Sequence, residues 1–287
     1  MSETLQLDRE RTVAEPVAAG APAPPRPSPA RRAARLAGAV AKRSVAVVAL
    51  LALWEVTPRA GLVDSVFLPP FSEVVGAWLE AAGSGLLWDN LQASVVRSVA
   101  GLAIAVVIAI PLGVLIGWYR TAAELLGPLL ELFRNTAALA LLPVFVLLLG
   151  LGESSKISLV VYASTWPILL NTVSAVRGVD ALLVKSARSL GFSSLQLFRK
   201  VVLPAALPTI FTGIRLAGAA SILVLVAAEM TGAKAGLGYM INAAQFNFAV
   251  PQMYAGIVTI ALLGLAFNQV LVSLERRFSR WRVEPSR

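Results

Sequence analysis

Residues that could do chemistry are scarce in this sequence, because its 287 residues include no Cys and no His. Their absence excludes thiolate nucleophiles, zinc sites of the usual kind, Ser-His-Asp triads and histidine proton relays. The nearest approach to a phosphate-binding loop is GLGESSK at 150–156, which lacks the second Gly directly before the Lys. We therefore predict no catalytic residue, no metal site and no cofactor bound by this chain.

The remaining candidates are polar and aromatic side chains inside long apolar segments. A charged group is costly in hydrocarbon, so it must face protein, water or the lipid head groups. Such residues more often form structural pairs or interface anchors than ligand contacts. If the segments enclose a path for a solute, its predicted contacts are Trp166, Asn171, Glu229, Arg97 and Arg134.

The elements that must position these residues are membrane helices. Hydrophobic residues make up 57% of the chain, charged residues only 14%, and the mean hydropathy is +0.75. A soluble domain of this composition would expose far larger apolar patches than monomers tolerate, and a membrane helix needs about 20 apolar residues. We predict an all-α, polytopic membrane protein with about six transmembrane helices, at 43–60, 91–118, 123–150, 156–176, 206–230 and 251–274.

The basic residues give the orientation of these helices. With the N-terminus inside, nineteen of the 25 Lys and Arg residues fall on cytoplasmic segments, three on outer segments and three within spans. Because cytoplasmic loops carry such an excess, we expect both termini in the cytoplasm. The net charge of +9 does not indicate nucleic acid, since the basic residues form no face interleaved with aromatic side chains.

The N-terminal 90 residues divide into two segments. Residues 1–38 are rich in Ala, Pro and Arg, which predicts a disordered cytoplasmic tail. A signal peptide is the alternative, since two basic residues precede the first apolar run, but no small-residue cleavage site follows. Residues 39–90 hold the first span and a periplasmic stretch around Trp78 and Trp88, whose amphipathic pattern predicts a helix at the membrane interface.

The longest predicted cytoplasmic loop, 177–207, is patterned like a structured element. Apolar residues recur at helical spacing ahead of Gly191, with basic residues on the other side. Because glycine permits the positive φ of a sharp turn, we expect two short helices meeting at Gly191, the second ending at Pro204. In the second span, Gly113 and Gly117 form a small-xxx-small pair that favours close helix packing.

This loop resembles the signature of the inner-membrane components of binding-protein-dependent ABC importers, in which an EAA-type segment and a Gly precede nine residues and Ile-x-Leu-Pro. Here nine residues separate Gly191 from Val-Val-Leu-Pro at 201–204. The resemblance implies a coupling helix that docks in a groove of a separate ATPase subunit. It assigns this contact to Lys185, Ser186, Ala187, Ser189, Leu190, Gly191, Phe192, Leu203 and Pro204. Lys185 stands where the family has a Glu, which alters or reverses a local ion pair with the ATPase.

Further segments are similar to the nitrate, sulfonate and taurine branch of this family: LWE at 53–55, LPPFSEV at 68–74, SVVRSVAG at 94–101 and AEMTGAKAGLGYMI at 228–241. The resemblance implies a type I ABC importer permease (MetI-like) fold, with its transmembrane domain at 91–275 and a basic cytoplasmic tail at 276–287. It also implies a multi-pass protein of the cell inner membrane that translocates a small, anionic organic solute. Its partners would be two ABC ATPase subunits that hold ATP-Mg, an extracytoplasmic solute-binding protein, a second permease copy and the lipid bilayer.

Two other functions are compatible with membrane helices alone. An ion-coupled secondary transporter would use intramembrane carboxylates, and only Glu131 and Glu229 lie well inside predicted spans. A passive channel would have no use for a docking helix in its cytoplasmic loop. Both alternatives are therefore less consistent with the sequence than an importer driven by a separate ATPase.

Overall fold

The structure is a computed structural model and describes residues 45–278. The predicted tail at 1–38, the start of the predicted first span and residues 279–287 of the predicted C-terminal tail lie outside the described residues. The chain divides into two units, Met1–Leu53 and Trp54–Arg287. Residues 45–59 are helical, and the candidate functional site lies entirely in the second unit.

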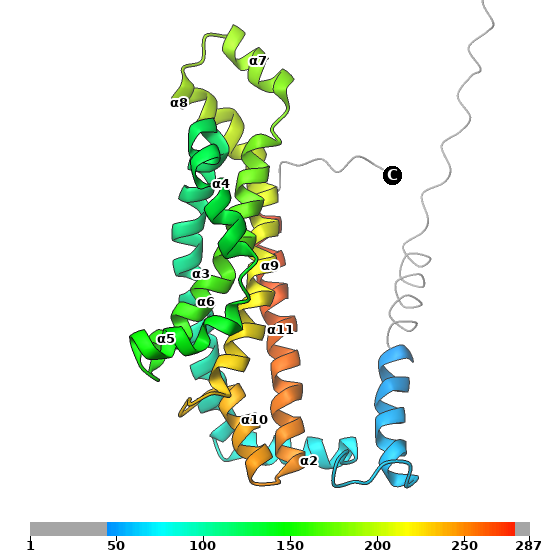
Figure 1. Cartoon of the computed structure of the whole chain (residues 1–287). Coiled ribbons are helices and arrows are strands. Elements are labelled where there is room, and N and C mark those ends of the chain that lie inside the picture. The colour runs from blue at the N-terminus through cyan, green and yellow to red at the C-terminus, as the bar shows by residue number, and fades with distance from the viewer. Residues whose placement is uncertain (1–44, 279–287) are drawn as a thin grey trace, which may run out of the picture. The chain divides into compact units, whose positions relative to one another are not determined.

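The second unit consists of helices joined by short turns, with no strand among its described residues (Figure 1). The helices are α2 (Phe71–Gly83), α3 (Leu86–Trp118), α4 (Arg120–Arg134), the 3-10 helix η1 (Ala138–Leu141), α5 (Leu142–Leu149), α6 (Glu153–Arg177), α7 (Ala181–Ser189), α8 (Ser194–Leu197), the π-helical turn η2 (Phe198–Val202), α9 (Leu203–Glu229), α10 (Leu237–Phe246) and α11 (Val250–Phe278). Four helical runs are long and apolar enough to cross a membrane: α3, α6, Ser194–Glu229 and α11. The predicted all-α, polytopic fold is confirmed.

The predicted third span, 123–150, is wrong as a single helix. α4 and the pair η1–α5 cover this segment at an angle of 85° to each other. Asn135 ends α4 as its C-cap, and Ala137 is extended. Pro143 lies at the start of α5, where its missing N–H could not have continued a preceding helix. Among the described residues the structure thus has four spanning helices, or five if the bent pair counts as one.

α6 packs between α3 and α9, and the three helices run side by side (Figure 1). Small residues allow the backbones of α3 and α6 to approach closely. A Cβ at Gly113 would lie 2.7 Å from Thr172 Cβ, and one at Gly117 would lie 2.8 Å from Val176 Cβ. Close approach of this kind is how membrane helices gain van der Waals contact in the absence of a hydrophobic driving force.

The helix predicted from the amphipathic stretch before the second span is α2. Its apolar residues Val74 and Ala77 are buried beside Ala255 of α11, and the Trp78 indole Nε1 donates to Thr259 Oγ1 at 3.0 Å. Trp88, predicted in the same stretch, lies instead in α3, which begins earlier than residue 91. α2 is therefore attached to the end of the bundle at which α11 begins.

Candidate functional site

The predicted coupling loop, 177–207, folds as a helical hairpin of α7 and α8 that joins α6 to α9. The Asp180 carboxylate caps α7 by accepting the backbone N–H two residues on, at 2.8 Å. Gly191 has a φ of +79°, a conformation that a Cβ disfavours, and the chain reverses there. Ser193 and Gln196 form a capping box that starts α8. The prediction of two short helices meeting at Gly191 is confirmed.

The predicted end of the second helix at Pro204 is wrong, because the helix continues from Ser194 to Glu229. Proline has no backbone N–H, and Pro204 lies in the first turn of α9 directly after a π-helical turn, where the regular hydrogen-bond pattern of the α-helix is interrupted. The chain reaches this position through the π-helical turn η2, in which the Leu203 N–H donates to Phe198 O five residues back. The hairpin is therefore continuous with a membrane helix and is not a separate appendage.

The apolar residues of the hairpin divide between two faces. Val184 and Ala187 pack inward, in a cluster that includes the buried start of α9. Leu182, Leu190 and Leu195 point outward and are 68%, 76% and 64% exposed. Several large apolar side chains exposed together on one short element are typical of a surface that another molecule covers.

The nine predicted docking residues fall into three groups. Ala187 is buried within the chain, so its small side chain fits α7 to α9 and does not face outward. The half-buried residues are Phe192, Leu203 and Pro204, and the exposed ones are Lys185, Ser186, Ser189, Leu190 and Gly191. Leu182 and Leu195 were not among the predicted docking residues, because helical periodicity does not indicate which apolar side chains another protein covers.

At the far end of α9, three helices meet at an ion cluster formed by Arg97, Glu153 and Glu229. Arg97 of α3 donates both to Glu153 at the start of α6 and to Glu229 at the end of α9, with an Nη1–Oε1 distance to Glu229 of 2.7 Å. The Arg97 and Glu229 side chains are 4% and 0% exposed, whereas that of Glu153 is 63% exposed. A buried ion pair is maintained only where further hydrogen bonds satisfy both groups.

Those further bonds hold the segment between α9 and α10 against α3. Glu229 Oε2 accepts from Ser94 Oγ at 2.8 Å and from the Gly238 N–H at 3.0 Å. Asn90 Oδ1 accepts the Gly236 N–H at 2.8 Å. Gly236 has a φ of +125°, and a Cβ there would collide with the Glu229 carboxyl group. The ion cluster thus fixes three helix ends and one turn in a single arrangement.

Comparison with known families decides what kind of protein carries these two features. Residues 109–281, more than half of the chain, match the family described as "Binding-protein-dependent transport system inner membrane component". The chain belongs to this family. It is thus the membrane permease subunit of an ABC importer, and it is not itself an enzyme, since ATP is hydrolysed by a partner subunit.

Curated relatives cover most of the permease. It is 36% identical to a putative aliphatic sulfonates transport permease protein of Bacillus subtilis, over 81% of this chain and 84% of the relative. It is also 36% identical to the taurine transport system permease protein of Escherichia coli, over 82% and 87%. A riboflavin transport system permease protein of Chloroflexus aurantiacus is 31% identical, over 83% and 88%.

Solved structures support the fold. A chain of the MetNI methionine ABC transporter in an inward facing conformation superposes with a TM-score of 0.57 at 20% identity, covering 67% of the permease and 96% of that chain. A chain of an amino acid ABC transporter with histidines gives a TM-score of 0.55 at 17% identity, covering 70% and 96%. These likenesses, together with the family, confirm the ABC importer permease fold and its place in a membrane that it crosses several times.

The remaining predicted pathway residues of the permease lie apart from the ion cluster. The Trp166 ring stacks on Phe133 at 6.2 Å between centroids, and its buried Nε1 has no hydrogen-bond partner among the described residues. Asn171 Nδ2 donates within its own helix, to Pro167 O at 2.8 Å. Arg134 forms an exposed pair with Glu131 on α4. The five predicted pathway residues therefore occupy separate places, and only Arg97 and Glu229 touch.

Proposed function

We propose that this permease imports a small organic anion of the sulfonate type and that the hairpin of α7 and α8 couples it to the ATPase. Support for the solute comes from the two relatives named for aliphatic sulfonates and for taurine, each 36% identical over more than four-fifths of the chain. A riboflavin permease at 31% identity also belongs to the family, so the solute class needs a direct test.

The observation that carries the coupling role is the outward face of the hairpin. Burial of a leucine side chain is worth about 1.5–3 kcal/mol relative to exposure, so Leu182 of α7 and Leu190 at its C-cap together favour association with a partner surface. Lys185 and Arg188 lie exposed on the same short helix, and their positive charges would complement an acidic surface on the partner. We infer that this face, with the exposed docking residues predicted above, binds the ATPase.

The assembly that fits this role contains two permease copies, two ATPase subunits that hold ATP-Mg, and an extracytoplasmic solute-binding protein. Both termini of the permease lie in the cytoplasm, which agrees with the excess of Lys and Arg on the segments assigned to that side. The hairpin then faces the cytoplasm, and the ion cluster lies toward the outer surface. The permease itself binds neither nucleotide nor metal in this scheme.

A reconstituted transporter tests the proposal. The permease, its ATPase and its binding protein are co-purified and placed in lipid vesicles, and ATP turnover and uptake are measured with taurine, an alkanesulfonate, nitrate and riboflavin in turn. We expect taurine or the alkanesulfonate to raise both rates. Stimulation by riboflavin alone would refute the anionic solute, and uptake that persists without the ATPase would refute the coupling role.

Trp166 is the pathway residue that we propose for direct contact with the solute, because its buried indole N–H lacks an acceptor among the described residues. Replacing it with Phe removes this donor and retains an aromatic ring. We expect Trp166→Phe to raise the KM for uptake while leaving solute-independent ATP turnover unchanged. An unchanged KM would assign Trp166 to packing against Phe133.

A further inference from the structure

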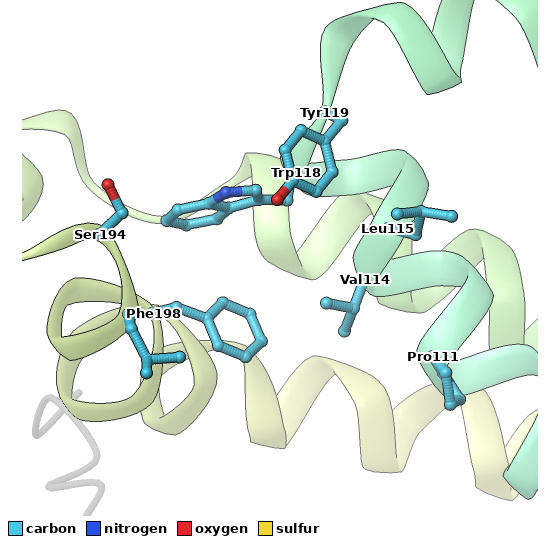
Figure 2. Close-up of a pocket in the computed structure, with 8 residues that line it drawn as sticks. Pro111, Val114, Leu115, Trp118, Tyr119, Ser194 and Phe198 are labelled. Carbon is cyan, nitrogen blue, oxygen red and sulfur yellow. The ribbon is translucent and has the colours of Figure 1, made fainter.

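Two pockets beside the hairpin have Trp118 in common and are together named the groove; its apolar half lies between α3 and the start of the run Ser194–Glu229. This half has a volume of about 480 Å3, and its lining includes Val114, Leu115, Trp118, Leu195 and Phe198. Figure 2 shows the α3 side chains on one side of the space and Phe198 on the other. The Trp118 and Phe198 rings meet edge to face, 5.4 Å apart between centroids. A space of this volume is within the range of about 300–1,000 Å3 typical of small-ligand sites.

The second half of the groove is polar and basic, and it adjoins the first at Trp118. It measures about 520 Å3, and both Arg120 and Arg177 line it. Glu124, the acidic residue of this lining, pairs with Arg120 at 2.9 Å. Arg177 Nη2 makes one long hydrogen bond, of 3.3 Å, to Ile116 O. With two arginines and one glutamate, the lining retains one net positive charge, and Arg177 forms no ion pair with any described residue.

We propose that this groove binds one anionic phospholipid of the cytoplasmic leaflet, with an acyl chain in the apolar half and the phosphate beside Arg120 and Arg177. The two halves share Trp118, and their apolar and cationic linings match the two ends of such a lipid, whereas a simple soluble ion would use only the cationic one. Basic pockets between membrane helices on the cytoplasmic side are suited to anionic head groups. Trp118 and Tyr119 mark the end of α3, as aromatic residues do at membrane interfaces.

The apolar half is also accessible from outside the bundle. Leu115, Tyr119 and Leu195 line it and are exposed among the described residues, so an acyl chain could enter laterally from the bilayer. Phe198 belongs to η2, the turn through which the hairpin joins α9. A lipid in this groove therefore contacts both a fixed membrane helix and the base of the hairpin. The inference rests on the cytoplasmic placement of the hairpin proposed above, and it is independent of the solute.

The test uses the assembled transporter in vesicles that contain a phosphatidylglycerol with a photoactivatable acyl chain, or the phosphatidylcholine with the same chain. After irradiation, mass spectrometry locates the labelled peptides. We expect phosphatidylglycerol to label peptides spanning 111–119 and 194–198, and to do so about fivefold more than phosphatidylcholine, the factor expected when one cationic side chain meets a net anionic head group and not a zwitterionic one. Equal labelling by both lipids, or no label in these peptides, would overturn the proposal, the latter by indicating that another subunit covers the groove.

Matched variants separate the two halves. Val114→Phe narrows the apolar half and should lower labelling there, whereas Val107→Phe, at an exposed position on the same helix, should not. Arg120→Gln should lower the ratio of labelling by phosphatidylglycerol to labelling by phosphatidylcholine about fivefold. Arg134→Gln, which breaks a similar exposed pair on α4, should leave this ratio unchanged. Equal effects of Arg120→Gln and Arg134→Gln would contradict a specific site for the phosphate.

Uptake measured in the same vesicles distinguishes this inference from the proposed function. Transport with an unlabelled groove would overturn the lipid site and leave the importer role intact. Labelling of the groove without sulfonate uptake would support the lipid site and count against the proposed solute.

Discussion

Replacing Arg97 with Met should destabilise the permease more than removing any exposed ion pair. The Arg97 and Glu229 side chains are almost completely buried, and Arg97 also donates to Ala235 O at 2.7 Å. Arg97→Met leaves the Glu229 carboxylate buried beside two neutral donors, Ser94 Oγ and the Gly238 N–H. Loss of one partner from a buried pair lowers the free energy of unfolding by about 3–5 kcal/mol. Glu153 contributes little to this loss, because its exposed carboxylate is solvated.

The free energy of unfolding can be measured by SDS titration of the permease in mixed micelles, followed by tryptophan fluorescence. Arg215→Met is the matched control, since the pair of Arg215 with Glu275 is longer, at 3.2 Å, and solvent reaches both side chains, which are 37% and 23% exposed. We expect this partly buried pair to contribute less than the fully buried one, because fully exposed pairs contribute only about 0–1 kcal/mol. A double replacement of Arg97 and Glu229 by Met removes both charges and should recover most of the loss. If Arg97→Met were no more harmful than Arg215→Met, or if the double variant were less stable than either single one, the reasoning would be refuted.

Three further predictions concern the hairpin and the packing of α3. Gly191→Val should lower solute-stimulated ATP turnover, because a β-branched residue is strained at a φ of +79°. Gly191→Asn should retain this turnover, since Asn tolerates the conformation. Equal turnover by the two variants would argue against a conformational requirement. Leu190→Gln should weaken co-purification of the ATPase without lowering the unfolding free energy of the permease, since this side chain is exposed; undiminished co-purification would place the interface elsewhere. Gly113→Leu should lower the free energy of unfolding by about 1–3 kcal/mol through overpacking against Thr172. Gly127→Leu on α4, where a Cβ meets nothing within 4 Å, should leave the free energy of unfolding nearly unchanged in the same SDS titration.

The sequence predicted the elements well where hydropathy and glycine chemistry act locally. Composition indicated membrane helices, and Gly191 indicated the turn of the hairpin because few other residues favour its positive φ. The prediction failed at 123–150, since we joined two apolar stretches across the polar residues Arg134 and Asn135, where the helix is broken. It failed also at Pro204, because a π-helical turn brings the chain to this proline without ending the helix.

The candidate site was predictable only in part. Arg97 and Glu229 stood out as costly charges in apolar segments, but 132 positions separate them, and no local pattern indicates that they pair. The role of Ser94, Asn90 and Gly236 in holding them was not predicted, since each is an ordinary small or polar residue by sequence. Their significance depends on tertiary contacts, which periodicity and composition do not encode.

The continuous helical run from Ser194 to Glu229 connects the hairpin to the ion cluster. Its 36 residues extend over about 54 Å at 1.5 Å per residue, so a tilt of about 5° moves one end by about 5 Å relative to the other. Glu229 at the distal end is bonded to α3 through Arg97 and Ser94. If the ATPase acts on the hairpin as proposed, it must therefore either move α3, α6 and α9 together or separate the buried charges of Arg97 and Glu229.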